Sequence, residues 1–239
     1  MKNTDKKEIN ISTFVDGDAQ DIGSSDRTQV SPAVIKRLPR YFRYLREVMR
    51  MGKTRISSSE LSKMMNVTAS QIRQDFNCFG GFGQQGYGYN VEYLYTNICE
   101  LLGVNRGFRA VIIGAGNLGK ALVRSPMFEK RGVDVVAMFD VSSDVIGRVI
   151  ADVTVLDMKR LEEYIREFKV DIAILTLPKE YAVEVSDTLV NTAIKGIWNF
   201  TGKEINVGDG VVVENVHIGD SLMTLCYEIA KNSDEESNE

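Results

Sequence analysis

A glycine-rich turn near the middle of the chain constrains its fold more than any other feature. The apolar run Ala110–Ile113 is followed by Gly114, Gly116 and Gly119 in the pattern G-x-G-x-x-G, and then by a helical pattern over residues 120–128. The first glycine allows the tight turn, the second lets the backbone approach a pyrophosphate, and the third lets helix and strand pack closely. A helix N-terminus at this place also favours phosphate, so the pattern predicts a Rossmann-type dinucleotide site.

A second apolar strand supports the same interpretation. Residues 133–139 end in Asp140, which lies 21 residues after Gly119, near the usual spacing of ~20 for the acid that binds the ribose hydroxyls. A carboxylate there repels a 2′-phosphate, so we expect NAD(H) to be preferred over NADP(H). A Rossmann-like domain with an empty or different pocket is the alternative.

The chain beyond Asp140 continues the alternation of helix and strand. Helical patterns over 156–168 and 181–194 alternate with apolar strands at 170–177, 196–200 and 211–216. This order predicts a doubly wound parallel sheet, in which ligands bind outside the carboxyl ends of the strands. The residues predicted to bind the cofactor are Gly114, Ala115, Gly116, Asn117, Leu118, Gly119, Asp140, Val141, Thr176, Leu177, Pro178, Asn199, Phe200 and Thr201.

Charge is unevenly distributed along the chain. Residues 27–90 hold eleven Lys/Arg and three acids, a net charge of +8, and because the whole chain carries −4, the remainder carries −12. A basic segment beside an acidic remainder is typical of a nucleic-acid-binding module joined to a different domain. A merely solvated basic face is the alternative.

The basic segment contains two short capped helices. Ser31-Pro32 begins a long helix, and the capping boxes at Ser57–Glu60 and Thr68–Gln71 begin two short helices separated by a tight turn. This arrangement predicts a helix-turn-helix, with an ordinary helical hairpin as the alternative. The aromatic and glycine residues of Phe79–Tyr89 then predict a β-ribbon, the wing of a winged helix.

The second short helix is the predicted recognition helix, which enters the major groove with its N-terminal residues leading. Gln and Arg side chains have the geometry to bind adenine and guanine edges, and arginines off the apolar stripe of the first helix are placed to face phosphates. The residues predicted to bind DNA are Arg37, Arg40, Arg55, Ser57, Ser58, Thr68, Ser70, Gln71, Arg73, Gln74, Phe82, Gln84 and Gln85.

The predicted organisation follows from these segments. It comprises a disordered tail (1–30), a winged-helix domain (31–105), a Rossmann domain (106–217), a C-terminal helix (218–231) and an acidic disordered tail (232–239). The three cysteines form no CxxC pair, which argues against a metal site and fits the cytoplasm. No apolar run approaches the ~18 residues of a membrane span, and no secretory signal is visible.

A winged helix followed by a Rossmann domain, with no room for a substrate domain, resembles the Rex family of redox-sensing transcriptional repressors. The stretches that carry the resemblance lie between about residues 32 and 230, and they are 33–41, 67–75, 79–90, 114–119, 139–140, 175–178 and 195–200. The resemblance implies a homodimer that binds a palindromic operator when NADH is scarce. It further implies that NADH binding moves the two winged helices out of register and that the C-terminal helix is swapped across the dimer.

The chain departs from the family pattern at several positions. Ser125 stands where the family commonly has Tyr, and His217 where it commonly has Asp; in the family these positions, with an arginine matching Arg43, help couple the nicotinamide pocket to the DNA-binding domain. Thr201-Gly-Lys replaces a small residue and Pro. Gln74 stands where Lys is common, and the wing tip Gln84-Gln85 lacks the usual basic residue.

Two alternatives differ in function. An NAD-dependent dehydrogenase needs a substrate domain and a general acid or base, but only about 120 residues follow Gly119 and the sole histidine lies at their far end. We therefore expect that the chain is not an enzyme. The second alternative, motivated by Ser125 and His217, is a Rex-like DNA-binding paralogue that ignores NADH or responds to another adenine-containing ligand, such as a CoA derivative.

Overall fold

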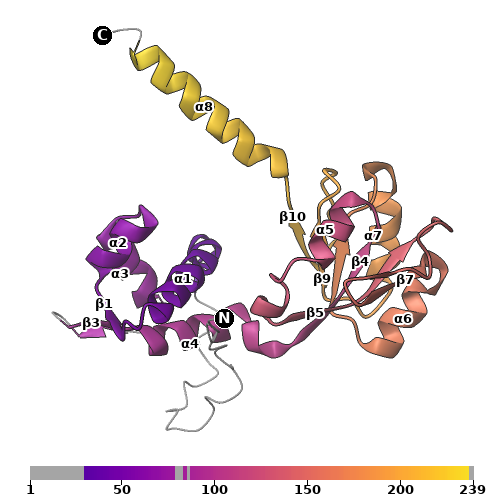
Figure 1. The fold of residues 1–239 in the computed structure, drawn as a ribbon, viewed down its shortest axis with the longest axis horizontal. Helices are drawn as coiled ribbons and strands as arrows, with labels where there is room; N and C mark the ends of the chain where they lie inside the picture. Colours follow the sequence, from indigo (N-terminus) through magenta and orange to yellow (C-terminus); the bar gives the residue numbers. More distant parts are fainter. Residues whose placement is uncertain (1–29, 79–82, 85–86, 237–239) are drawn as a thin grey trace, which may run out of the picture. The chain divides into compact units, whose positions relative to one another are not determined.

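The computed structural model describes residues 30–78, 83–84 and 87–236, and these fall into two compact units (Figure 1). One unit ends at Leu101 and the other begins at Leu102, close to the predicted domain boundary. Of the predicted tails, 1–30 and 232–239, residues 1–29 and 237–239 lie outside the described residues.

The first unit is built on a long helix, α1 (Pro32–Arg50). It begins as the sequence predicts, because the Ser31 hydroxyl accepts a hydrogen bond from the Val34 backbone N–H and Pro32 occupies the first turn. Its buried face carries an apolar stripe at helical spacing: Val34, Leu38, Tyr41, Phe42, Leu45 and Val48.

The helix-turn-helix is confirmed by α2 (Ser58–Met65) and α3 (Ala69–Asn77). Asn66 ends α2 in the left-handed conformation, which turns the chain sharply enough for α3 to pack against α2. The capping box of α2 is complete, with Ser57 and Glu60 each bonding the other's backbone N–H. That of α3 is half formed: Thr68 accepts from the Gln71 N–H, but the Gln71 side chain bonds elsewhere.

In its described residues, 83–84 and 87–90, the wing forms the predicted ribbon, with one strand more than expected. Strands β2 (Gly83–Gln84) and β3 (Gly88–Asn90) are antiparallel, and β1 (Arg55–Ile56) pairs with the other edge of β3. A strand of two residues is too short to show periodicity, so β1 was not predicted. Asn90 then begins α4 (Val91–Leu102) by accepting a hydrogen bond from the Tyr93 backbone N–H.

The second unit is a doubly wound sheet of seven strands, all parallel except for the β6–β7 pair. In spatial order the strands are β10 (Val212–Asn215), β9 (Gly196–Asn199), β8 (Ile172–Leu175), β4 (Phe108–Ile113), β5 (Val133–Asp140), β7 (Val153–Asp157) and β6 (Val149–Ile150). From β4 the chain proceeds first to β5 and β7, and then to β8, β9 and β10 on the other side. The strand order therefore reverses between β4 and β8, which is where such folds bind ligands.

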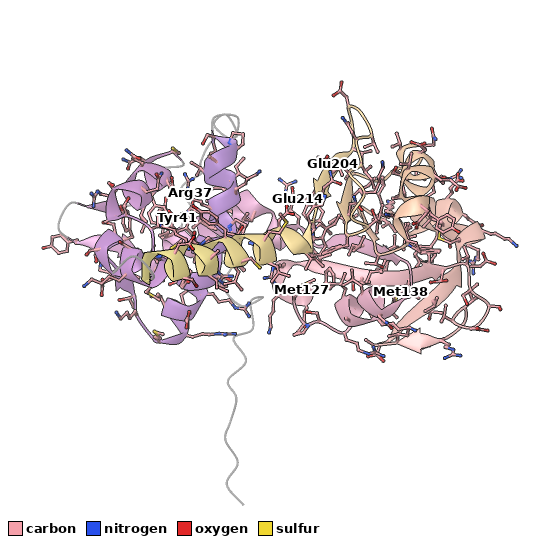
Figure 2. All side chains as sticks on the ribbon, turned by 90° about the horizontal axis from the view of Figure 1, so that it is seen from above. Arg37, Tyr41, Met127, Met138, Glu204 and Glu214 are labelled. Atoms are coloured by element: carbon pink, nitrogen blue, oxygen red, sulfur yellow. The ribbon has the colours of Figure 1, made fainter. Side chains whose placement is uncertain are left out.

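Both faces of the central strand β4 are buried. Val111 and Ile113 pack with α6 (Leu161–Phe168) and α7 (Ala182–Val190). Ile112 faces the opposite side with Met138 of β5, which Figure 2 labels, and with partly buried residues of α5 (Asn117–Val123). This two-sided burial explains why β4 is a continuous apolar run.

Three predicted elements need correction. The helix after the glycines ends at Val123 and not at residue 128, because Ser125-Pro126 cannot continue it. The predicted helix 156–168 is the end of β7, a 3-10 turn (Met158–Arg160) and α6. Helix α8 (Ile218–Glu236) continues through residues 232–236, which were predicted to be disordered.

The hairpin between β6 and β7 turns through two non-glycine residues with positive φ. Ala151 (φ 49°) and Asp152 (φ 64°) form a two-residue loop between the paired residues Ile150 and Val153. Such a loop favours Asn-Gly, because an alanine held in the left-handed region costs roughly 1–2 kcal/mol.

We expect the double variant Ala151→Asn/Asp152→Gly to stabilise the second unit by about 1 kcal/mol and to raise its melting temperature by roughly 3 °C. Thermal unfolding followed by fluorescence of Trp198, the only tryptophan, reports on this unit. Asp152→Asn controls for the lost charge. A lower melting temperature in the double variant would show that the turn is not strained.

Candidate functional site

The turn between β4 and α5 lies at the point where the strand order reverses. Gly114 has φ 105°, and a Cβ there would lie 2.7 Å from the Thr176 carbonyl oxygen at the end of β8. A Cβ on Gly119 would collide with the Gly114 carbonyl oxygen. The first and third glycines are therefore required by backbone packing, as the sequence predicts.

Gly116 differs from its two neighbours in the motif. A Cβ on Gly116 would meet no atom within 4 Å, and its φ of −73° is accessible to any residue. It is the N-cap of α5 and has no side-chain capping bond, and Asn117 and Leu118 form the first turn of that helix. The open side of Gly116 and the unpaired N–H groups of this turn form a cradle for an anion.

Asp140 ends β5 beside this cradle. Its carboxylate accepts hydrogen bonds from the backbone N–H groups of Ala115 (2.6 Å) and Ser142 (2.9 Å). The acid is thus held in place against the glycine turn, where the motif predicts the ribose-binding carboxylate. Val141, which follows it, is 82% exposed.

Three of the predicted pocket residues, Thr176, Asn199 and Thr201, use polar side-chain groups in bonds within the protein. The Thr176 hydroxyl donates to the Gly114 carbonyl oxygen at 2.8 Å, so it fixes the glycine turn. The Asn199 side chain, 2% exposed, donates to the Lys203 carbonyl oxygen and to the Asn215 side chain, and its oxygen accepts from the backbone N–H and the hydroxyl of Thr201.

These bonds use the whole hydrogen-bonding capacity of the Asn199 amide, so its predicted contact with a ligand is replaced by a structural role. Asn215, which the sequence did not single out, completes this link between the ends of β9 and β10. The neighbouring Phe200 ring packs on Trp198 at 4.5 Å, and Leu177 and Pro178 follow β8 at the same edge of the sheet.

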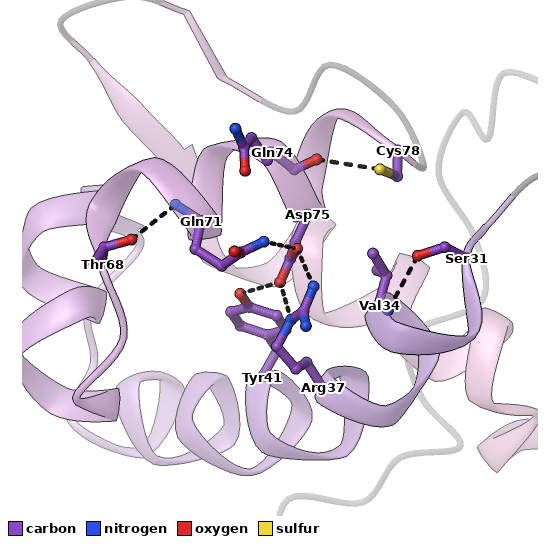
Figure 3. Close-up of polar contacts among 9 residues, drawn as sticks. All are labelled: Ser31, Val34, Arg37, Tyr41, Thr68, Gln71, Gln74, Asp75 and Cys78. Atoms are coloured by element: carbon purple, nitrogen blue, oxygen red, sulfur yellow. Dashed lines mark hydrogen bonds and ion pairs between the residues drawn. The ribbon is translucent and has the colours of Figure 1, made fainter.

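The first unit contains a buried polar network centred on Asp75 of α3 (Figure 3). The Asp75 carboxylate, 1% exposed, accepts two hydrogen bonds from the Arg37 guanidinium at 2.7 Å, one from the Tyr41 hydroxyl at 2.7 Å and one from the Gln71 amide at 2.8 Å. Arg37 was predicted to face phosphates, but its guanidinium is engaged by Asp75. The sequence does contain a signal for this network: an acid stands four residues after Gln71 within a strongly basic segment.

The network keeps Asp75 ionised. Burial opposes its ionisation, but hydrogen bonds from Arg37, Tyr41 and Gln71 outweigh burial and hold the pKa of Asp75 below its usual value. Burial and the bond to Asp75 together raise the pKa of Tyr41, so its hydroxyl stays a donor.

The other predicted DNA contacts are divided between exposed and bonded side chains. Ser70 and Gln74 are exposed on α3. Arg73 is also exposed and donates to the Ser58 hydroxyl at 3.1 Å, whereas the Arg40 guanidinium donates to the Met65 carbonyl oxygen at the end of α2.

The wing and its base are only partly described. Arg55 donates to the Tyr87 carbonyl oxygen at 3.4 Å across the base of the wing. Phe82, Gln85 and the side chain of Gln84 lie outside the described residues.

The three predicted coupling residues lie on separate elements. The Arg43 guanidinium stacks over the Tyr44 ring at 5.4 Å and is exposed. The Ser125 hydroxyl accepts a weak hydrogen bond from the Met127 N–H at 3.4 Å. His217 is exposed, and its carbonyl oxygen accepts from the Asp220 N–H at the start of α8.

Over residues 30–78, 83–84 and 87–236, no group of three His, Cys, Asp or Glu side chains is placed to hold a metal ion. Within the same described part of the chain, no helix is both long and apolar enough to cross a membrane.

Comparisons with known proteins agree with this two-part organisation. A family model described as a putative DNA-binding protein N-terminus matches residues 29–77, and one described as a CoA binding domain matches residues 105–202. The redox-sensing transcriptional repressor Rex of Thermoanaerobacter pseudethanolicus is 51% identical over 205 residues, which cover 86% of this chain and 92% of the relative.

The chain belongs to the Rex family. The Rex repressor of Caldicellulosiruptor bescii is 50% identical over 85% of this chain and 94% of its own length, and that of Clostridium tetani 48% identical over 84% and 95%.

Solved structures of a Rex-family repressor called RSP have the same fold. Its complex with β-NAD+ and operator DNA has a TM-score of 0.81 at 50% identity and covers 88% of this chain and 97% of its own. Its complex with β-NADH has the same TM-score at 46% identity and covers 88% and 99%.

The buried ion pair generates a prediction for stability. We expect Arg37→Met to destabilise the first unit by about 2–4 kcal/mol, because it leaves the Asp75 carboxylate without its charge partner. Urea unfolding at pH 7, followed by helical circular dichroism, measures this loss. Because the pKa of Asp75 is lower in the folded state, the stabilisation is present above the unfolded value near 3.9 and is lost as pH falls through the folded value.

The difference in free energy of unfolding between wild type and Arg37→Met should therefore become smaller below pH about 4. The double variant Arg37→Met/Asp75→Asn is the matched control. Its loss in free energy of unfolding should be at least about 1 kcal/mol smaller than the sum of the losses in the two single variants. Additive losses would show that Arg37 and Asp75 do not interact.

Proposed function

We propose that this chain is a redox-sensing transcriptional repressor that binds operator DNA and is released from it by NADH. The observation that supports this most directly is the anion cradle at the reversal of strand order, in a chain that also carries a helix-turn-helix. The solved relatives bound to NAD+, to NADH and to operator DNA are similar to this chain over both units.

The residues of the cradle fit a dinucleotide. The N–H groups of Gly116 and the first turn of α5 would hold the pyrophosphate, and the Asp140 carboxylate would accept hydrogen bonds from the ribose hydroxyls. When a dinucleotide is bound, the redox state of its nicotinamide supplies the signal. Leu177, Pro178, Phe200 and Thr201 lie at the sheet edge that would receive it, with Thr176 and Asn199 supporting the backbone behind them.

On the DNA side, α3 is the element that would enter the major groove. Ser70, Arg73 and Gln74 are exposed polar residues in its first two turns and are proposed to contact bases or phosphates. Arg55 is proposed to contact phosphate beside the wing. The operator is proposed to be palindromic, because a dimer presents two equivalent recognition helices.

We propose that α8 forms the dimer by packing on a second copy of the chain. Ile218, Leu222, Leu225 and Ile229 lie on one side of this helix by their spacing, and each is between 55% and 62% exposed. A stripe of this kind, on a helix with no buried side chain over residues 218–234, requires a partner surface. We propose a cytoplasmic protein without catalytic activity or a metal.

The first test is binding to an AT-rich palindromic operator, measured by fluorescence anisotropy at fixed salt. We expect saturating NADH to weaken operator binding at least about tenfold, while NAD+ and NADPH have little effect; a ligand must bind the two states unequally to produce this change. Tight operator binding that all three dinucleotides leave unchanged would contradict the NADH switch and favour another adenine-containing ligand.

The variant Gly116→Ala tests whether NADH acts by binding in the cradle. Its methyl group meets no protein atom within 4 Å, so the melting temperature should stay unchanged while the NADH response is lost. Gly119→Ala is the contrasting variant, because its methyl group collides with the Gly114 carbonyl oxygen and should also lower the melting temperature. A normal NADH response in Gly116→Ala would place the dinucleotide elsewhere.

The dimer has a separate test. We expect Leu222→Asp/Ile229→Asp to sediment as a monomer, because the charges interrupt the apolar stripe, while Trp198 fluorescence keeps its native spectrum. Thr224→Asp, on α8 but outside the apolar stripe, is the matched control and should remain a dimer. Equal sedimentation of wild type and the double variant, both as dimers, would show that this stripe is not the interface.

A further inference from the structure

The recognition helix carries a glutamine whose side chain is oriented by the buried network. Gln71 is the third residue of α3, near the end that leads into the major groove in helix-turn-helix proteins. Its side chain is half-buried, and its amide nitrogen donates to Asp75 Oδ1 at 2.8 Å. This position places the amide between the protein interior and the face that carries Ser70 and Gln74.

The chemistry of Asp75 determines which end of that amide faces inward. An ionised carboxylate can only accept hydrogen bonds, and Asp75 is ionised because the Arg37 guanidinium pairs with both of its oxygens and the Tyr41 hydroxyl also donates to it. The NH2 group of Gln71 must therefore face Asp75. The opposite orientation would bring two acceptor oxygens together in a buried site.

The carbonyl oxygen of the Gln71 amide is left available to a partner outside the protein. Its oxygen lies on the side of the amide away from Asp75 (Figure 3) and has no hydrogen-bond partner among the described residues. A free glutamine can pair with adenine through both its oxygen and its nitrogen. Here the nitrogen is anchored, so the oxygen is the group available to a base.

The identity of the base follows from this polarity. In the major groove, adenine N6 and cytosine N4 are the exocyclic amino donors, whereas guanine O6 and thymine O4 are acceptors that would oppose the Gln71 oxygen. We propose that Gln71 accepts a hydrogen bond from an exocyclic amino group of one base in each operator half-site, with Asp75 as the positioning residue. This inference rests on the proposed DNA-binding function.

The experiment removes the amino group from the DNA and the amide from the protein. In each half-site, adenine is replaced by purine and cytosine by 2-pyrimidinone, one position at a time, and full-length wild type and Gln71→Met are compared by anisotropy. For wild type, we expect one position at which loss of the amino group weakens binding roughly tenfold. The base analogue that gives this effect distinguishes adenine from cytosine.

For Gln71→Met, the same analogue should cause no further loss, because the acceptor is already absent. Gln74→Met is the matched control on the same helix: whatever its overall affinity, it should keep the full penalty for the missing amino group. An equal penalty in wild type and Gln71→Met at every position would overturn the proposal. Failure of wild type to bind any operator would instead contradict the proposed function.

Asp75→Asn tests the positioning role. An asparagine at this place can donate as well as accept, so both orientations of the Gln71 amide become accessible, and the amino-group penalty should fall severalfold. A lowered melting temperature of the first unit would show that Asp75→Asn does not fold properly. The comparison of wild type with Gln71→Met then tests the proposal by itself. A folded Asp75→Asn that keeps the full penalty would show that Asp75 does not orient Gln71.

Discussion

The contact between Gly119 and the Gly114 carbonyl oxygen is the constraint on which the second unit depends. It brings α5 so close to the end of β4 that no side chain fits at position 119. The Thr176 hydroxyl binds the same carbonyl oxygen from the end of β8, so three elements meet at one peptide group. That peptide group lies where the strand order reverses. The same close packing therefore leaves the N–H groups at the start of α5 facing the ligand-binding edge of the sheet.

Local signals in the sequence predicted most of the fold. Ser31-Pro32 and Ser57–Glu60 begin helices through side-chain bonds that involve only neighbouring residues, and these are visible in the sequence. The β6–β7 hairpin was missed because Ala151-Asp152 lacks the Asn-Gly or glycine signal of a tight turn. Helix α5 was overestimated because apolar residues continue at helical spacing past Ser125-Pro126.

The candidate site was predictable in position but not in its contacts. The motif placed Gly114, Gly116 and Asp140 correctly beside one another, because their roles follow from backbone geometry. Thr176 and Asn199 were predicted at the correct edge of the sheet, yet their polar groups bond to the protein. Sequence gives the number of donors and acceptors on a side chain, but whether the fold has already used them depends on residues far away in the chain.

The position of α8 in the chain has a consequence for synthesis. The first unit and all strands of the second unit's sheet precede this helix, so both have their complete sequence before the apolar stripe of α8 emerges from the ribosome. During synthesis the units can therefore fold without an exposed surface that would attract other nascent chains. A chain with the same stripe placed before its domains would expose that surface throughout translation, when a second copy is least available to cover it.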